Sequence, residues 1–474
     1  MSSFPQYLEY FSQTIENVSV ARFKVPPTSN SAVQSHQQIQ FLLPSNAMVN
    51  MRTAKVAFQV TTDSGKARLP PLASSYFSRI SIEMGGQTVS SFESANLLDH
   101  ILVNNMQLDA DPVSEKSKLT RKVNPVTILD MSKETYDTSN NKAYFNIDLG
   151  VFARSVQPGI LALNLCPTMS ITLHLAENAV VSSPENITTA ALFIAPAPAG
   201  QSKYTIENSN LLVDVLDISG GDLQSIYQAT MLQEGFLEIT YDHWSSFTDT
   251  FNTVARCSSS AMSLNKVVAT FRRSSGNRAP FPNGNAGYNG VNGCVGSIGY
   301  NNQLVAAADA AVGTIPGVLG TPDSNGTDFT SAYFTMTAPT TLAAGTAVSA
   351  LVADTKEEPQ INLSVNNVQF PSYNCAISEW YEVSKSAWGI SKSKSLSLAE
   401  YCTNKFSICQ SFNLPASSQL RLISGLNLKA SNAQINLSVT GGSTNATTDD
   451  NVVIYLCSSN IIRLGSGKQL QILH

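Results

Sequence analysis

Charged side chains are scarce in this chain. They make up 13% of the 474 residues, against about 25% in a typical soluble domain, and the formal net charge is −5. The sequence contains no run of five like charges, and its first sixteen residues contain neither Lys nor Arg. Because these features leave no basic patch for nucleic acid, we expect no sequence-specific nucleic-acid binding. A largely neutral polar surface suits a protein that packs against copies of itself.

Disulfide and metal-ligand patterns are also missing. The seven cysteines are scattered and form no C-x-x-C pair, which argues against a disulfide framework or a zinc site and favours reduced, buried thiols. The five histidines are isolated, whereas a cupin needs an H-x-H motif with further ligands. We therefore predict no metal and no cofactor. The residues concerned are Cys166, Cys257, Cys294, Cys375, Cys402, Cys409 and Cys457, with His36, His100, His174, His243 and His474.

Catalytic motifs fail on inspection. Residues 465–468 end like a phosphate-binding loop, but Ile462 replaces the first glycine of that motif and Gln469 replaces its hydroxyl residue. Residues 293–299 lack the glycine two positions before Ser297 that a nucleophile elbow requires. We predict no catalytic residues and no enzyme activity.

The sequence patterns of signal peptides and membrane spans are also missing. The first residues lack the basic and apolar stretches of a signal peptide, and the longest apolar runs fall far below the ~18 residues of a membrane span. We expect the protein to be made and folded in a cytosol-like compartment.

What the sequence does contain is an internal repeat. Residues 80–103 align with residues 361–384 at a constant offset of 281, since Ile80 falls on Ile361. Each copy alternates apolar and polar residues, reaches a pair that tolerates φ > 0, alternates again and then changes to helical spacing. The predicted hairpin turns are Gly85 with Gly86 and Asn366 with Asn367. The aligned helix positions are Ala95, Leu98 and Leu102 in the first copy and Ala376, Glu379 and Val383 in the second.

The repeat and the many short strand-like runs predict an all-β chain of two related domains. The first spans residues 17–203, and the second spans residues 204–474 after a Pro- and Ala-rich stretch. The second carries a tower-like insertion at about 274–350, which is rich in Asn, Gly, Ala and Thr. Residues 1–16 form an amphipathic arm whose apolar residues, at helical spacing, are Phe4, Tyr7, Leu8, Phe11 and Ile15.

In the order of these strand patterns, the chain resembles the double jelly-roll major capsid proteins of icosahedral double-stranded DNA viruses. It is most similar to those of the virophage, polinton-like and related lineage. The resemblance covers nearly the whole chain, and residues 206–216 look like the entry into the second barrel. The segments that carry it are residues 23–27, 38–44, 79–106, 145–149, 171–175, 206–216, 366–371 and 461–473.

The resemblance implies two tandem eight-stranded jelly rolls and a structural role in the virion. Three chains would close into a homotrimer with a pseudo-hexameric outline, and these capsomers would tile an icosahedral shell assembled inside the host cell. The five apolar arm residues would then make basal contacts with neighbouring capsomers, with minor capsid or penton proteins, or with an internal membrane.

Three alternatives remain open at this stage. A minor capsid protein of the penton or spike type usually carries one jelly roll rather than two similar ones. A carbohydrate-binding protein built from tandem β-sandwiches would be expected to have a secretion signal. An enzyme on a bicupin scaffold would need metal ligands that the histidine pattern does not supply.

Overall fold

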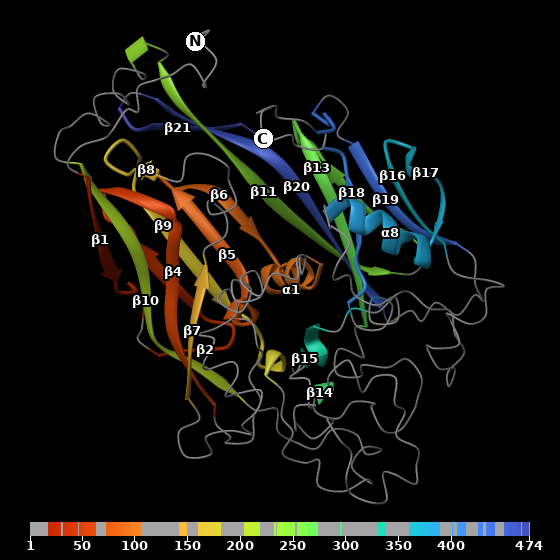
Figure 1. Ribbon diagram of the computed structural model, residues 1–474, viewed down its shortest axis with the longest axis horizontal. Coiled ribbons are helices and arrows are strands. Elements are labelled where there is room, and N and C mark those ends of the chain that lie inside the picture. Colours follow the sequence, from red (N-terminus) through yellow and green to blue (C-terminus); the bar gives the residue numbers. More distant parts are fainter. Residues whose placement is uncertain are drawn as a thin grey trace, which may run out of the picture.

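A computed structural model gives the fold of this chain (Figure 1). The described residues are 18–29, 32–45, 47–62, 73–105, 142–148, 160–181, 203–218, 232–233, 235–251, 254–273, 294–295, 330–334, 336, 360–388, 401, 405–413, 425–429, 433–440, 450–465 and 467–473.

The first half of the chain forms two facing β-sheets. One has the order β1-β10-β4-β7, with β2 added on β10 and β8 on β4, and the other has the order β3-β9-β5-β6. The bounds are β1 (Val18–Val25), β2 (Ala32–Gln34), β3 (Gln38–Leu42), β4 (Met48–Thr62), β5 (Phe77–Met84), β6 (Gln87–Phe92), β7 (Lys142–Asp148), β8 (Ile160–Ala162), β9 (Met169–Leu175) and β10 (Tyr204–Ile218). The helices are α1 (Ala95–Asn105) and the short 3-10 turns η2 (Ala73–Tyr76) and η3 (Asn178–Val180).

The second half repeats this plan. Its sheets have the orders β11-β20-β13-β18 and β12-β19-β16-β17, with β21 added on β20. The bounds are β11 (Phe236–Phe251), β12 (Val254–Ser259), β13 (Leu264–Arg273), β16 (Gln360–Val365), β17 (Val368–Ala376), β18 (Ile408–Ser411), β19 (Ala433–Thr440), β20 (Asp450–Gly465) and β21 (Gln469–Leu473). The helix α8 (Ile377–Trp388) follows β17, and a small ladder of β14 (Cys294–Val295) and β15 (Thr330–Ser331), with η7 (Ala332–Phe334), lies between β13 and β16.

The two halves share one topology. The strands of each half can be ranked along the chain, with β1 and β2 together as the first, β7 and β8 as the sixth, and β14, β15 and β21 left out. The sheets then read first-eighth-third-sixth and second-seventh-fourth-fifth in both halves. This order, with antiparallel pairing throughout these sheets, is that of an eight-stranded jelly roll. The prediction of an all-β chain with two tandem jelly rolls is therefore confirmed.

The repeated hairpins are the fourth and fifth strands of each barrel. Met84 pairs with Gln87 across the first turn, and Val365 pairs with Val368 across the second. The turn residues have left-handed backbone, with φ of 59° and 78° at Gly85 and Gly86 and of 51° and 65° at Asn366 and Asn367. Two consecutive positive φ angles are what a two-residue type I′ turn requires, and Gly and Asn are the residues that adopt them most readily.

The helix after each hairpin departs from the constant offset. The helices begin at Ala95 and Ile377, which are 282 positions apart rather than 281. The buried positions Ala95, Leu98 and Leu102 of α1 therefore correspond to Ile377, Trp380 and Ser384 of α8. The predicted alignment to Ala376, Glu379 and Val383 is wrong by one residue. The cause is a longer irregularity in the second hairpin, where Leu363 pairs with Phe370 but Ile361 pairs with Cys375.

The boundary between the halves also lies later than predicted. Residues 204–218, expected to open the second domain, form β10, which pairs with β1, β2 and β4. β10 is thus the last strand of the first barrel. The Pro- and Ala-rich stretch at residues 184–200 suggests a linker between domains. It instead precedes β10, which lies between β1 and β4 in the first sheet.

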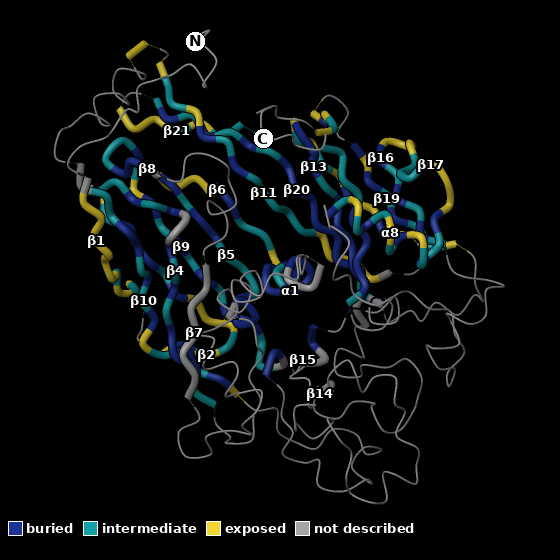
Figure 2. Tube along the Cα trace, in the orientation of Figure 1, coloured by how far each residue is buried: buried dark blue, intermediate teal, exposed yellow. Residues whose placement is uncertain are grey.

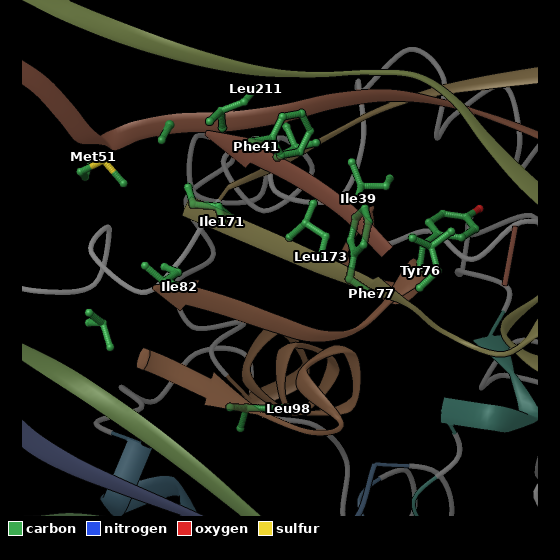
Figure 3. Packing of buried hydrophobic residues seen from close by; sticks show 14 of the residues in the cluster. Ile39, Phe41, Met51, Tyr76, Phe77, Ile82, Leu98, Ile171, Leu173 and Leu211 are labelled. Carbon is green, nitrogen blue, oxygen red and sulfur yellow. The ribbon is translucent and has the colours of Figure 1, made fainter. Parts of the chain in front are cut away.

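Alternating side chains fill each barrel. In β9, Met169, Ile171, Leu173 and Leu175 are buried while the residues between them are partly exposed. Figure 3 shows Ile171 and Leu173 packed with Ile39 and Phe41 of β3, with Leu211 of β10 nearby. The same period-2 pattern produces the dark core traces of both barrels in Figure 2.

Five of the seven cysteines have described side chains, and all five are buried and form no disulfide, as predicted: Cys166, Cys257, Cys375, Cys409 and Cys457. The arm at residues 1–16 and most of the insertion at 274–350 lie outside the described residues.

The two glycines of the first turn should differ in their response to alanine. A Cβ on Gly85 would lie 2.8 Å from Cβ of Pro167, whereas a Cβ on Gly86 would meet nothing within 4 Å. Gly86→Ala should cost about 1–2 kcal/mol from the left-handed backbone alone, and Gly85→Ala should cost more. Urea denaturation measures both, with Gly86→Asn as the control that should lose least, and equal losses for the two alanine variants would contradict the packing described.

Candidate functional site: the junction between the two barrels

The core of the first barrel continues into the second half of the chain. One apolar cluster contains residues from β3, β4, β5, β9 and β10 of the first barrel together with twelve buried residues from the second half. These twelve are Ile239, Tyr241, Val268, Tyr333, Phe334, Met336, Trp388, Cys409, Val453, Tyr455, Ile462 and Leu464. The second barrel also has a separate core between its own two sheets.

In the sheet β11-β20-β13-β18, the two central strands β20 and β13 are buried on both faces as a result. In β20, Val452, Ile454 and Leu456 belong to the core of the second barrel, while Val453 and Tyr455 belong to the cluster shared with the first. β13 divides in the same way, with Val267 and Ala269 on one side and Val268 on the other. Figure 1 shows β11 and β20 running diagonally between the two barrels, next to α1 and β6.

Two tyrosine hydroxyls join the barrels by hydrogen bonds. The hydroxyl of Tyr241 on β11 donates to the backbone carbonyl of Val89 on β6 at 2.8 Å. The hydroxyl of Tyr455 on β20 donates to the carbonyl of Ser94, just before α1, at 2.9 Å. Burial raises the pKa of Tyr241 to about 12, so this hydroxyl is a neutral donor at physiological pH.

A stacked pair adds a third connection. The imidazole of His100 on α1 lies parallel to the ring of Phe334 in η7, with 3.8 Å between centroids. The Nε2 atom of His100 is 2.8 Å from the hydroxyl of Ser75 in η2, which fixes the orientation of the imidazole. Phe334 thus ties the inserted segment to the helix of the first barrel.

The side chain of Leu98 shows where α1 lies relative to the two barrels. In Figure 3 it lies apart from Ile82 and the other strand residues, on the helix that runs beside the second-half strands. α1 therefore covers the first barrel and at the same time forms part of the junction.

The junction is built from apolar packing, two hydroxyl hydrogen bonds and one stacked pair of rings, all among the described residues. Within them, no group of three or more His, Cys, Asp or Glu side chains is placed to hold a metal ion. No helix in the described ranges is both long and apolar enough to cross a membrane. At the junction, burial raises the pKa of the Cys409 thiol to about 12, which keeps it protonated and unreactive at neutral pH.

Comparison by sequence gives no relative: no protein-family model and no curated protein matches the chain. Comparison of structures gives several matches. PBCV-1 VP54, as fitted into a reconstruction of the virophage Sputnik, matches with a TM-score of 0.59 at 13% identity, covering 99% of both chains. A chain of the PBCV-1 virus capsid gives 0.59 at 14% identity, again covering 99% of both. The Faustovirus major capsid protein gives 0.53 at 9% identity, covering 98% of this chain and 93% of that one.

This chain is a double jelly roll. At these identities the likeness establishes the fold, and it extends over both barrels. The double jelly roll therefore includes the junction, because the compared proteins cover the two barrels together rather than one at a time.

The residues singled out from the sequence are not among those that join the barrels, or they lie outside the described part. Phe4, Tyr7, Leu8, Phe11 and Ile15 are not among the described residues. Gly85, Gly86, Asn366 and Asn367 form the hairpin turns, and Gly86 lies three residues before Val89.

The junction residues themselves went unpredicted, although one signal was present. Residues 452–457 are a continuous apolar run, and such a run in a strand is typical of burial on both faces. An alternating strand, in contrast, would have one face toward solvent.

Removing the two hydroxyls tests how much they contribute. Tyr241→Phe and Tyr455→Phe keep the apolar packing and should each lower the free energy of unfolding by about 1 kcal/mol, because each loses one buried hydrogen bond. Chemical denaturation measures the loss, and Thr28→Val, which removes an exposed bond from the Thr28 hydroxyl to the Gln40 carbonyl, is the matched control. Losses no larger than that of the control would contradict a stabilising role for these bonds.

Proposed function

We propose that this chain is the major capsid protein of an icosahedral double-stranded DNA virus, located in the virion shell after assembly inside the host cell. The observation that carries the proposal is the junction: two barrels of identical topology share one buried cluster within a chain that matches PBCV-1 VP54 over 99% of both lengths. The Faustovirus protein with the same fold is a major capsid protein. The role is structural and requires no catalytic residue.

The geometry explains how such a chain could tile a shell. Two similar barrels fixed side by side make a unit with two nearly equivalent corners, so three chains in a closed ring present six. A homotrimer would thus have a pseudo-hexameric outline that packs in a near-hexagonal array. The low proportion of charged residues, 13%, favours the neutral faces that such packing buries.

Contacts beyond the trimer can be individually weak, because many of them act together in a shell. We propose neighbouring capsomers and minor capsid or penton proteins as the further partners, with an internal membrane as a third candidate for the arm at residues 1–16. Two barrels in one chain favour the major protein over a penton- or spike-type minor protein, for which one barrel is usual.

The oligomeric state is the direct test. Light scattering on the purified protein should give a mass near three times 50.8 kDa, and negative-stain images should show hexagonal outlines. A monodisperse monomer at all accessible concentrations would rule out the capsomer.

Deletion of residues 1–16 should separate trimer formation from shell assembly. We expect the truncated chain to form trimers of unchanged stability, since the barrels and their junction are built from residues 18–473. Shell formation, followed by electron microscopy or sedimentation, should be impaired. Loss of the trimer itself would show that the arm acts within the capsomer.

A further inference from the structure

Three titratable or charged side chains form a row across the outer face of the first barrel. In β9, Leu173 and Leu175 are buried in the barrel, so His174 between them lies on the outer face, where it is partly exposed. His174 is the direct partner of Arg79 in the ladder between β9 and β5. Glu93, which follows the last residue of β6, continues the row. We call His174, Arg79 and Glu93 the outer row.

The contacts of Arg79 fix the protonation state of His174. Nη1 of Arg79 donates to Oε1 of Glu93 at 2.9 Å, and its Nη2 lies 3.2 Å from Nε2 of His174. A guanidinium carries only donors and stays charged in proteins. Nε2 of His174 therefore accepts this hydrogen bond, which requires a neutral imidazole with its proton on Nδ1. An imidazolium would turn an N–H toward the guanidinium and place two positive groups in contact.

The other elements around His174 bring little charge to it. On its other side lies β3, where Gln38 is its direct partner and where no residue is charged. On β5, the second charged residue is Glu83, four positions beyond Arg79, and β9 has no titratable side chain besides His174. His36, in the turn before β3, is exposed. The outer row is thus the main electrostatic environment of this imidazole.

Folding makes His174 harder to protonate. Partial burial and then the charge of Arg79 lower the pKa of His174 below its ordinary value of 6.5, while Glu93 raises that pKa in part. The unfolded chain therefore takes up a proton here more readily than the folded chain does. The stabilisation is complete above pH 6.5 and is lost as the pH falls below that value toward the folded-state pKa.

The end of β9 connects the outer row to the junction between the barrels. Two residues after His174, the carbonyl of Ala176 accepts from the buried hydroxyl of Tyr204 at 2.6 Å, and the N–H of Ala176 donates to the carbonyl of Tyr76 at 2.8 Å. The chain then forms η3, which lies beside η7. Phe334 of η7 belongs to the junction. A displacement of this end of β9 would therefore reach the contact between η3 and η7.

We propose that the outer row is an acid-sensitive switch. While His174 is neutral, Arg79 holds β9 to β5 and to Glu93, and protonation of His174 from solvent breaks the first of these bonds and releases the end of β9. The row is open to solvent, since the side chains of Arg79 and Glu93 are 37% and 61% exposed. The switch lies within one chain, so it goes beyond the proposed function and does not depend on it.

Titration of the histidines by NMR tests the switch directly, because the chain has only five of them. The His174 signal, assigned by its loss in His174→Gln, should titrate below pH 6.5. Arg79→Gln should raise this pKa, since it removes a positive neighbour, and Glu93→Gln should lower it further. Titration at or above 6.5 in the wild type, or a pKa unchanged by Arg79→Gln, would overturn the switch.

Hydrogen exchange measures whether the proton loosens the barrel. Between about pH 7.5 and about pH 5.5, protection of the β9 and η3 amides, corrected for intrinsic exchange, should fall at least about threefold further in the wild type than in His174→Gln. The glutamine oxygen can still accept from Arg79 but takes up no proton. His36→Asn is the matched control, because it removes an exposed histidine and asparagine tolerates the φ of 65° there.

The control should follow the wild type at both pH values. An equal fall in the wild type and in His174→Gln would overturn the switch. That result would leave the proposed function standing, because neither measurement depends on the oligomeric state of the chain.

Discussion

The burial of two strands, β13 and β20, on both faces holds this molecule together. A jelly roll normally has an inner face of apolar residues and an outer face of polar ones, and two such barrels would be connected only by their linker. Here β20 and β13 place alternate residues in two different cores, so the outer face of the second barrel completes the packing of the first. Removing either barrel would expose the apolar side chains of the other. The relative position of the barrels is therefore part of the folded state, and a building block for a regular shell needs that fixed geometry.

Polar contacts at this junction are few but directional. Apolar burial contributes most of the free energy, yet it is tolerant of small displacements. The hydroxyls of Tyr241 and Tyr455 each reach one particular backbone carbonyl, and His100 is held by Ser75 against Phe334. These contacts join η7, β11 and β20 to fixed points on β6, α1 and η2. The apolar cluster thus supplies most of the stabilising free energy, and the three polar or aromatic contacts fix the position of one barrel relative to the other.

Local patterns predicted the strands well, because period-2 alternation and turn residues are properties of neighbouring positions. The Gly85–Gly86 and Asn366–Asn367 pairs revealed the hairpins since few other residues adopt two positive φ angles in succession. Errors arose where the answer depends on distant partners. β10 was assigned to the wrong barrel because its sequence does not say whether it pairs with β4 or with β11. The junction was missed for the same reason, since Tyr241 and Val89 are 152 positions apart. The one-residue shift of α8 follows from the irregular pairing of β17, which no periodicity in the sequence indicates.

The bond between Tyr455 and Ser94 spans 361 positions of the chain. A ribosome adding about 5–20 residues per second needs roughly 20–70 s to cover that distance. Once β10 has been made, the first barrel is complete in strands but still lacks the residues that cover α1 and β6. Only a chain finished almost to its last strand can adopt the native surface. Truncated products of interrupted synthesis would therefore keep an exposed apolar patch that chaperones and proteases recognise. Only full-length chains would then be available for assembly.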